Sequence, residues 1–248
     1  MSSRRLNTLH SHLQGRIRSA ELRLETSACV GKNDEVAIAC GDDVLCRIAS
    51  PPPLRMDLVP VGYVELFRDN DGSLKQEFLE CVLFIMKKDV MKQDIFLIGS
   101  PGRTRRDVIL AYCELTLREV EIVCISQDTT VSDIKQRREI RKLDAVFVDG
   151  PAVRAAILGR ILILDGVEKA ERNILSVLNN LLENREMHLE DGRFLTNPSR
   201  FEIQDENHRQ ELLNHHNKLV PVHPRFRTVA LGLPIPGKLF LDYLELVH

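Results

Sequence analysis

The chain has 248 residues, of which 44% are hydrophobic and 28% charged, a composition that suits a globular protein with one large domain and appendages. Its formal net charge of -2 gives no electrostatic reason to expect nucleic acid or an anionic membrane as partner. The sequence contains no run of about eighteen apolar residues, so it predicts no membrane span. The six cysteines are scattered without a CxxC pair, so the sequence favours reduced, mostly buried thiols in an intracellular compartment over a zinc site or disulfides.

The first 25 residues have the composition of a mitochondrial presequence. Residues 1–20 contain four arginines, four serines and no acidic residue. Leu6, Leu9, Leu13 and Ile17 recur at helical spacing, which predicts an apolar stripe beside the basic side chains. Arg-rich, Ser-rich and acid-poor amphipathic segments are typical of organelle import signals, so we expect import into mitochondria. The alternative is an ordinary basic amphipathic helix or a disordered start.

Residues 26–73 are expected to form an N-terminal extension and linker, because the three prolines Pro51–Pro53 exclude a helix and favour extended chain. Residues 74–94 show dense helical periodicity, which predicts a helix. From there, short apolar runs alternate with helical patterns, as in βαβ units that build a parallel sheet covered on both faces. Strands are predicted at 95–100, 121–126, 144–150, 160–166 and 227–233, helices at 107–120, 131–143, 153–160 and 171–186, and a polar insertion at 197–226.

The junction at residues 95–106 has the architecture of a P-loop, since an apolar strand runs through a glycine-containing loop directly into a helix. In such a loop, backbone amides and the helix N-terminus hold a phosphate chain. The full pattern is GxxxxGK[ST]. Its eight positions are occupied here by Gly99, Ser100, Pro101, Gly102, Arg103, Thr104, Arg105 and Arg106.

Three of these positions depart from the pattern. Thr104 stands at the second glycine, where a side chain crowds the approach of phosphate. Arg105 replaces the lysine and keeps its charge with a different reach. Arg106 places a cation where a hydroxyl should ligate Mg²⁺. On the loop alone, a strand-to-helix turn without ligand is the stronger interpretation; anion binding by the arginines and a solvated basic turn are equally open.

A second feature favours the phosphate interpretation. About sixty residues later, the apolar segment 160–166 ends in Asp165, and in P-loop enzymes an acid at such a strand end holds Mg²⁺. A strand-terminating acid or helix N-cap is the alternative role. The next residue is Gly166, and Glu168 is the first acid that could serve as catalytic base. Two extra residues of extended chain would displace its carboxylate by roughly 6–7 Å.

Four segments spread across residues 90–236 resemble the MoxR-like and dynein-related branch of AAA ATPases: QDIFLIGSPG, SQDTTVSDIKQRREI, GRILILDGVEKAERNILSVLNNLLENREMHLEDGRFL and FRTVALGLPIP. The resemblance implies an α/β fold, a P-loop NTPase αβα sandwich with a parallel sheet, over residues 74–248. It implies ATP with Mg²⁺, assembly with other AAA modules or subunits in a ring or pseudo-ring, and work on protein clients. It also implies a β-hairpin at REMHLEDGRF, and a large relative is associated with mitochondria.

Compared with this family, the sequence lacks two expected features. A polar sensor residue is expected after the fourth strand, where Leu233 stands, and the sequence after Pro236 contains no clear C-terminal lid. One hypothesis is therefore an ATPase subunit that binds ATP·Mg²⁺ at residues 99–106 with Asp165. The other hypothesis is a non-hydrolytic AAA-fold scaffold or regulatory module. The departures from the pattern at Thr104, Arg106, Gly166 and Leu233 favour this second hypothesis, because they disfavour ATP hydrolysis by this chain alone.

Two further clusters carry little weight. The basic run at residues 135–142 lacks aromatic stacking partners, so a solvated helix face is a better interpretation than a nucleic-acid interface. His208, His215, His216 and His223 have no compact ligand spacing, which disfavours a metal site.

Overall fold

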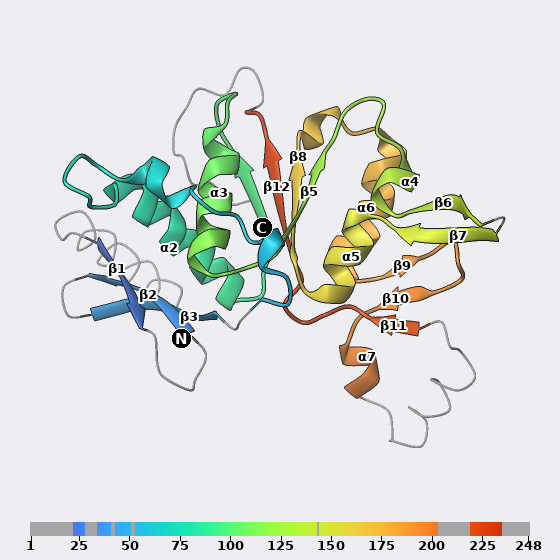
Figure 1. The fold of residues 1–248 in the computed structure, drawn as a ribbon, viewed down its shortest axis with the longest axis horizontal. Helices are drawn as coiled ribbons and strands as arrows, with labels where there is room; N and C mark the ends of the chain where they lie inside the picture. Colours follow the sequence, from blue (N-terminus) through green and yellow to red (C-terminus); the bar gives the residue numbers. More distant parts are fainter. Residues whose placement is uncertain are drawn as a thin grey trace, which may run out of the picture. The chain divides into compact units, whose positions relative to one another are not determined.

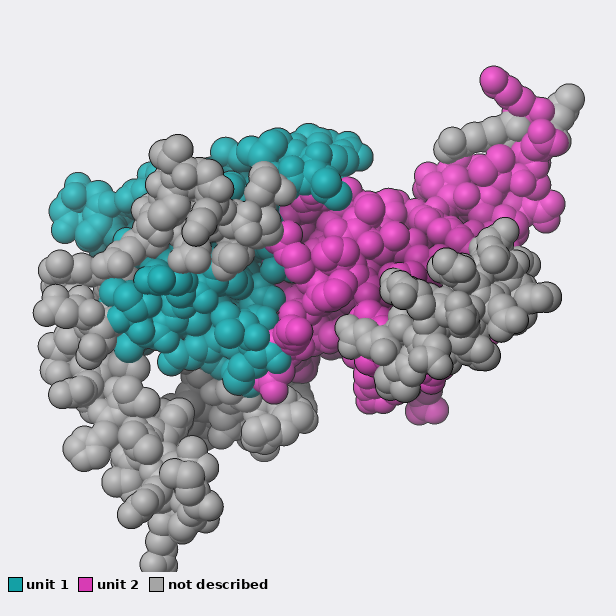
Figure 2. Space-filling model, turned by 90° about the horizontal axis from the view of Figure 1, so that it is seen from below, with its two compact units in different colours: residues 1–91, 107–118 teal, residues 92–106, 119–248 magenta. Residues whose placement is uncertain are grey.

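The computed structural model describes residues 22–27, 34–40, 43–50, 53–142, 144–202 and 219–234. The chain divides into two compact units, one drawn from residues 1–91 and 107–118 and the other from residues 92–106 and 119–248 (Figures 1 and 2). Residues 1–21, which hold most of the expected presequence, lie outside the described residues. None of the helices in the described ranges combines the length and the apolar character that a membrane crossing requires.

The first unit contains an antiparallel three-stranded sheet. Most of it falls in residues 26–73, the segment expected to be extension and linker, but its first strand begins inside the 25 residues expected to be a presequence. Its strands, in spatial order, are β1 (Leu22–Ser27), β2 (Asp34–Cys40) and β3 (Asp43–Ser50). The central strand carries the buried residues Val36 to Ala39. Two short 3-10 helices follow, η1 (Met56–Leu58) and η2 (Val64–Phe67). The predicted helix over 74–94 is confirmed as α2 (Gln76–Val90).

A buried polar cluster joins α2 to α3 (Thr104–Leu115), most of which belongs to this unit. Asp89 accepts hydrogen bonds from the Tyr112 hydroxyl and from Arg118, both at 2.8 Å. Burial and the Asp89 charge raise the pKa of Tyr112 well above its usual value, so the hydroxyl remains a donor. Burial also raises the pKa of the Cys113 thiol to about 12. The expectation of mostly buried thiols holds for Cys113 alone among the cysteines whose side chains are described, since Cys46 and Cys81 are partly exposed and Cys124 is exposed.

The second unit is built on a parallel sheet whose strands have the order β4-β12-β8-β5. These strands are β4 (Ile95–Ile98), β12 (Arg227–Gly232), β8 (Ile161–Asp165) and β5 (Val120–Cys124). All three pairings are parallel. Ile161 to Leu164 of β8 are almost fully buried, as expected for an interior parallel strand. The α/β fold predicted from the alternating pattern is therefore confirmed.

Two helices pack against this sheet and supply its main hydrophobic core. They are α5 (Pro151–Leu158) and α6 (Arg172–Glu183). Their buried residues, such as Ala152 and Leu178, join Leu162 and Leu164 of β8 in one cluster. In Figure 1 both helices lie beside β5 and β8. In the chain, α5 directly precedes β8 and α6 follows it, so the helical segments predicted at 153–160 and 171–186 are confirmed.

The prediction of a helix over residues 131–143 is wrong beyond its first turn. The helix α4 (Val131–Ile134) begins with a capping box, in which Thr130 and Asp133 exchange hydrogen bonds, and then ends. The chain continues as β6 (Gln136–Arg141), which pairs antiparallel with β7 (Asp144–Asp149). The basic run has no apolar stripe that would bury a helix face, so strand pairing satisfies its backbone instead. The predicted strand at 144–150 thus joins a hairpin and not the parallel sheet.

A second hairpin lies beside the first. Its strands are β9 (Met187–His188) and β10 (Phe194–Thr196), and β11 (Leu219–Pro221) pairs parallel with β10. The hairpin expected at REMHLEDGRF is therefore present. A short helix, α7 (Ser199–Glu202), begins the segment predicted as an insertion, of which residues 203–218 lie outside the described part.

A polar network joins the base of the first hairpin to the turn of the second. Gln136 donates to Asp149 and Asp191 at 2.7 and 3.0 Å, and Arg193 also contacts both carboxylates. Burial alone would raise the pKa of Asp191, but hydrogen bonds from the Arg193 amide, Gln136 and the Arg193 guanidinium outweigh it and hold this pKa below its usual range. The network fixes the base of an otherwise exposed two-stranded hairpin, a structure that is marginal alone.

Candidate phosphate-binding site

The loop between β4 and α3 has the local geometry that the sequence pattern predicts. The strand ends at Ile98, and the helix begins at Thr104. Gly102 has a φ of 145°, a conformation that residues with a side chain rarely adopt. At Gly99, an added Cβ would lie 3.2 Å from Cδ of Arg105, so the glycine leaves room for the arginine stem to lie against the loop.

Arg105, at the lysine position, ties the loop to the end of β12. Its Nη1 donates to the backbone carbonyl of Gly232, and the Gly99 amide donates to the same oxygen at 3.4 Å. Its Nε is buried and has no hydrogen-bond partner among the described residues. A buried guanidinium nitrogen without an acceptor is costly, and a phosphate oxygen is an acceptor well suited to it. The position of Arg105 therefore fits a polyphosphate.

Asp165 lies close to the loop, at the end of β8. The Arg106 Nη1 is 3.6 Å from Asp165 Oδ2, and the two side chains are 38% and 28% exposed. In the sheet, β12 lies between β4 and β8. The carboxyl ends of parallel strands nevertheless meet at one edge of the sheet, which brings Asp165 to the loop.

Glu168 is nearer to the strand end than an extended chain would place it. Gly166 has a φ of 86°, and its amide donates to the Leu231 carbonyl at 3.2 Å. The chain then turns into η3 (Val167–Lys169). As a result, Glu168 Oε1 lies 4.0 Å from the position that a Cβ at residue 166 would occupy. The turn brings the carboxylate back toward the site, and Glu168 is itself exposed.

The residue after β12 offers no polar group. Leu233, which stands at the expected sensor position, is 36% exposed and follows the Gly232 carbonyl that Arg105 contacts. An apolar side chain cannot orient a water molecule or bind a phosphate oxygen. The end of β12 therefore contributes backbone alone to the site.

The residues present do not fit a Mg²⁺ ion of the usual P-loop kind. Such an ion is held by a hydroxyl at the last loop position and an acid on a nearby strand. Here the hydroxyl is replaced by the Arg106 guanidinium, which is paired with the acid. The described ranges also contain no cluster of three or more His, Cys, Asp or Glu side chains that could hold a metal. Of the four histidines considered above, His223 alone is described, and its Nδ1 accepts the Arg225 amide within a turn.

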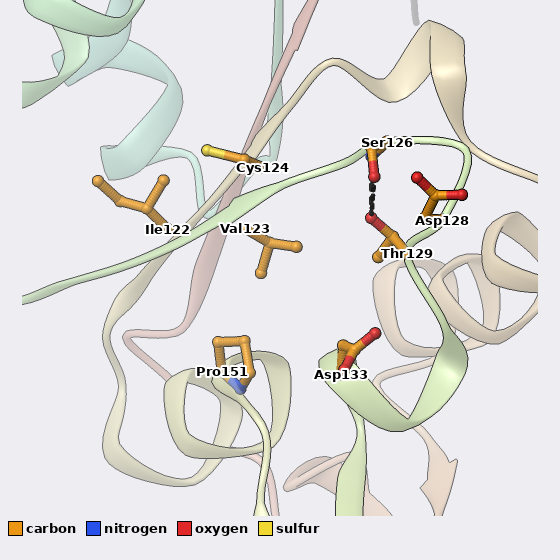
Figure 3. A pocket seen from close by; sticks show the side chains of 8 residues that line it. All are labelled: Ile122, Val123, Cys124, Ser126, Asp128, Thr129, Asp133 and Pro151. Atoms are coloured by element: carbon orange, nitrogen blue, oxygen red, sulfur yellow. Dashed lines mark hydrogen bonds between the residues drawn. The ribbon is translucent and has the colours of Figure 1, made fainter.

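A separate cavity of about 390 Å³ lies at the carboxyl end of β5 (Figure 3). It is lined by Ile122, Val123, Cys124, Ser126, Asp128, Thr129, Asp133 and Pro151. Its polar groups serve the local backbone: Thr129 Oγ1 accepts the Ser126 amide at 2.9 Å, and Asp133 caps α4. None of the loop residues 99–106 lines this cavity, so it is not the phosphate site.

Comparison with known proteins agrees with the geometry. The chain matches the AAA domain (dynein-related subfamily) over residues 94–242. It belongs to this AAA family. It is 47% identical over 216 residues to von Willebrand factor A domain-containing protein 8 of Mus musculus, an alignment that covers 87% of this chain and 11% of that protein. The chain thus spans about a tenth of that relative's length.

A solved structure also matches part of the chain. It is that of a proposed ATPase from Cytophaga hutchinsonii, 12% identical, with a TM-score of 0.46 over 71% of this chain and 42% of that protein. The family predicted from the sequence is confirmed by the match over residues 94–242.

Within this AAA domain, sequence reasoning missed two features. The first is the Gly232 carbonyl, the acceptor of Arg105, because a backbone acceptor leaves no mark on the sequence. The second is the contact between Arg106 and Asp165. The opposite charges at the two motif ends were visible, but their distance depends on the strand order.

Proposed function

We propose that this AAA module binds ATP through the loop of residues 99–106 and does not hydrolyse it on its own. The observation that carries the proposal is the convergence of three strand ends: the loop after β4, the Gly232 carbonyl of β12 and Asp165 of β8. A loop backbone and a helix N-terminus beside arginines favour a phosphate chain. The arginines of the loop and the apolar Leu233 disfavour turnover.

The binding half of the proposal is tested by equilibrium dialysis of the whole chain against labelled ATP. Replacing Arg105 by alanine removes the cation at the lysine position, and we expect its affinity for ATP to fall about tenfold, the effect of losing one charge-assisted hydrogen bond. Arg138→Ala on β6 removes the same charge outside the loop and should leave affinity unchanged. Equal losses in both variants, or no binding by the unaltered chain, would contradict ATP binding at the loop.

The second candidate function is a non-hydrolytic scaffold or regulatory module that acts beside other AAA modules or subunits in a ring or pseudo-ring and contacts protein clients. The pairing of Arg106 with Asp165 favours it, because the opposite charges of two motif positions offset each other without a ligand. Failure to bind ATP in the dialysis experiment would support this function over the first.

We also propose that the protein is imported into mitochondria. The support is the basic, acid-poor and amphipathic composition of residues 1–20. Deleting these residues from a tagged chain should move it from mitochondria to the cytosol, as seen by fractionation or microscopy. A deletion variant that localises like the full chain would exclude a presequence there.

A further inference from the structure

The metal position of the proposed ATP site is occupied by a side chain of the protein. The Arg106 guanidinium lies 3.6 Å from the Asp165 carboxylate, where a divalent cation would need that carboxylate and a hydroxyl. The positive charge of the guanidinium offsets the negative charge of Asp165. A Mg²⁺ ion placed at Asp165 would be repelled by the positive charge of Arg106. It would also lack the hydroxyl ligand that the usual P-loop site provides.

The pair is also loose enough to accept a second anion. At 3.6 Å, the two atoms form an ion pair that is longer than a normal hydrogen bond, and both side chains are partly exposed. The guanidinium carries five N–H donors, and a single carboxylate oxygen at this distance satisfies none of them closely. Arg106 therefore retains N–H groups that can donate hydrogen bonds to phosphate oxygens. Arg105 in turn has a buried Nε without a partner in the described part of the chain.

The net charge of the nucleotide also affects how strongly the arginines attract it. The loop and the first turn of α3 carry three arginines within four residues. ATP without metal carries about four negative charges, and bound Mg²⁺ cancels two of them, so the metal weakens the attraction between ATP and the arginines.

We propose that the guanidinium of Arg106 takes the place of the divalent cation at Asp165, so that the loop binds the polyphosphate of a nucleotide without Mg²⁺. This inference rests on the proposed ATP binding and adds a property that the AAA pattern does not predict. It has a direct consequence for Asp165: in a metal-holding site the acid strengthens nucleotide binding, whereas here it competes with the nucleotide for Arg106.

The test compares the affinity of the whole chain for labelled ATP in EDTA and in excess Mg²⁺, by equilibrium dialysis. We expect ATP to bind about fivefold tighter in EDTA, since removing the metal restores two charges near the arginines. Asp165→Asn should bind ATP in EDTA at least as tightly as the unaltered chain. Binding that requires Mg²⁺, or is weakened by Asp165→Asn in EDTA, would overturn the inference while leaving ATP binding intact.

Two variants of Arg106 separate charge from side-chain shape. Arg106→Ser restores the hydroxyl and frees Asp165, and we expect it to reverse the preference so that Mg²⁺ tightens binding. Arg106→Lys keeps the charge and should keep the preference for metal-free ATP. If Arg106→Ser retains the original preference, Arg106 is not what excludes the metal and the inference fails. No binding of ATP in either buffer would instead refute the proposed function itself.

Discussion

Replacing Arg160 by alanine will lower the free energy of unfolding by about 3–5 kcal/mol, the usual effect of removing one partner from a buried ion pair. Arg160 is only 4% exposed, and it donates to Glu119 and Glu121, both at 2.6 Å. These carboxylates are 8% and 10% exposed, so the substitution removes a cationic partner of both in a site that water scarcely reaches. Because most domains are stable by about 5–15 kcal/mol, much of the margin disappears.

Arg154→Ala is the matched control for this prediction. Arg154 also binds Glu121, through Nε at 3.0 Å and Nη2 at 2.7 Å, but its side chain is 41% exposed. Solvent screening should limit its cost to about 1 kcal/mol. Denaturant unfolding of both variants measures the difference. Similar losses in the two variants would mean that burial of the pair does not determine its contribution.

The second large effect concerns catalysis. With ATP and Mg²⁺, we expect the chain to release no more phosphate than its Asp165→Asn variant. In a competent site, removing one charge-stabilising group typically lowers the rate about 10²–10³-fold. Here Arg106 already occupies the Asp165 carboxylate, and Leu233 provides no polar group to orient water. We therefore expect no ATP hydrolysis in the unaltered chain that the loss of the Asp165 carboxylate could slow.

A sensitive phosphate-release assay on purified chains provides this comparison. Glu168→Gln serves as a second variant, because the turn at Gly166 brings the Glu168 carboxylate near the strand end. Phosphate release by the unaltered chain that either substitution abolishes would show a working catalytic site. In that case Glu168 would be the residue that activates water, and the non-hydrolytic interpretation would be abandoned.

Much of the fold was predictable from sequence because its signals are local. The apolar run that forms β8 is buried, as are Ile174, Leu178 and Leu181 of α6, and burial produces such patterns. The hairpin of β6 and β7 was not predictable in the same way. Its stability comes from cross-strand pairing and from the network of Gln136 with Asp149 and Asp191, contacts between residues up to 55 positions apart.

In the candidate site, too, local sequence signals predicted some features, whereas others depend on the tertiary structure. The glycine-containing loop and Asp165 carry recognisable residue types at recognisable spacing. Their distance depends on β12 lying between β4 and β8, and the place of Glu168 depends on the left-handed turn at Gly166. Neither follows from residue spacing, because an extended-chain estimate ignores the turn. The pairing of Arg106 with Asp165 required coordinates for the same reason.

The most direct measurement for the central claim, that the loop after β4 encloses a polyphosphate, is a crystal structure of the chain grown with saturating ATP in EDTA. We predict phosphate density against the backbone amides of the loop, with the Arg105 guanidinium moved from the Gly232 carbonyl to a phosphate oxygen. Nucleotide bound elsewhere, or Arg105 still bonded to Gly232 beside a loop without phosphate, would contradict the account.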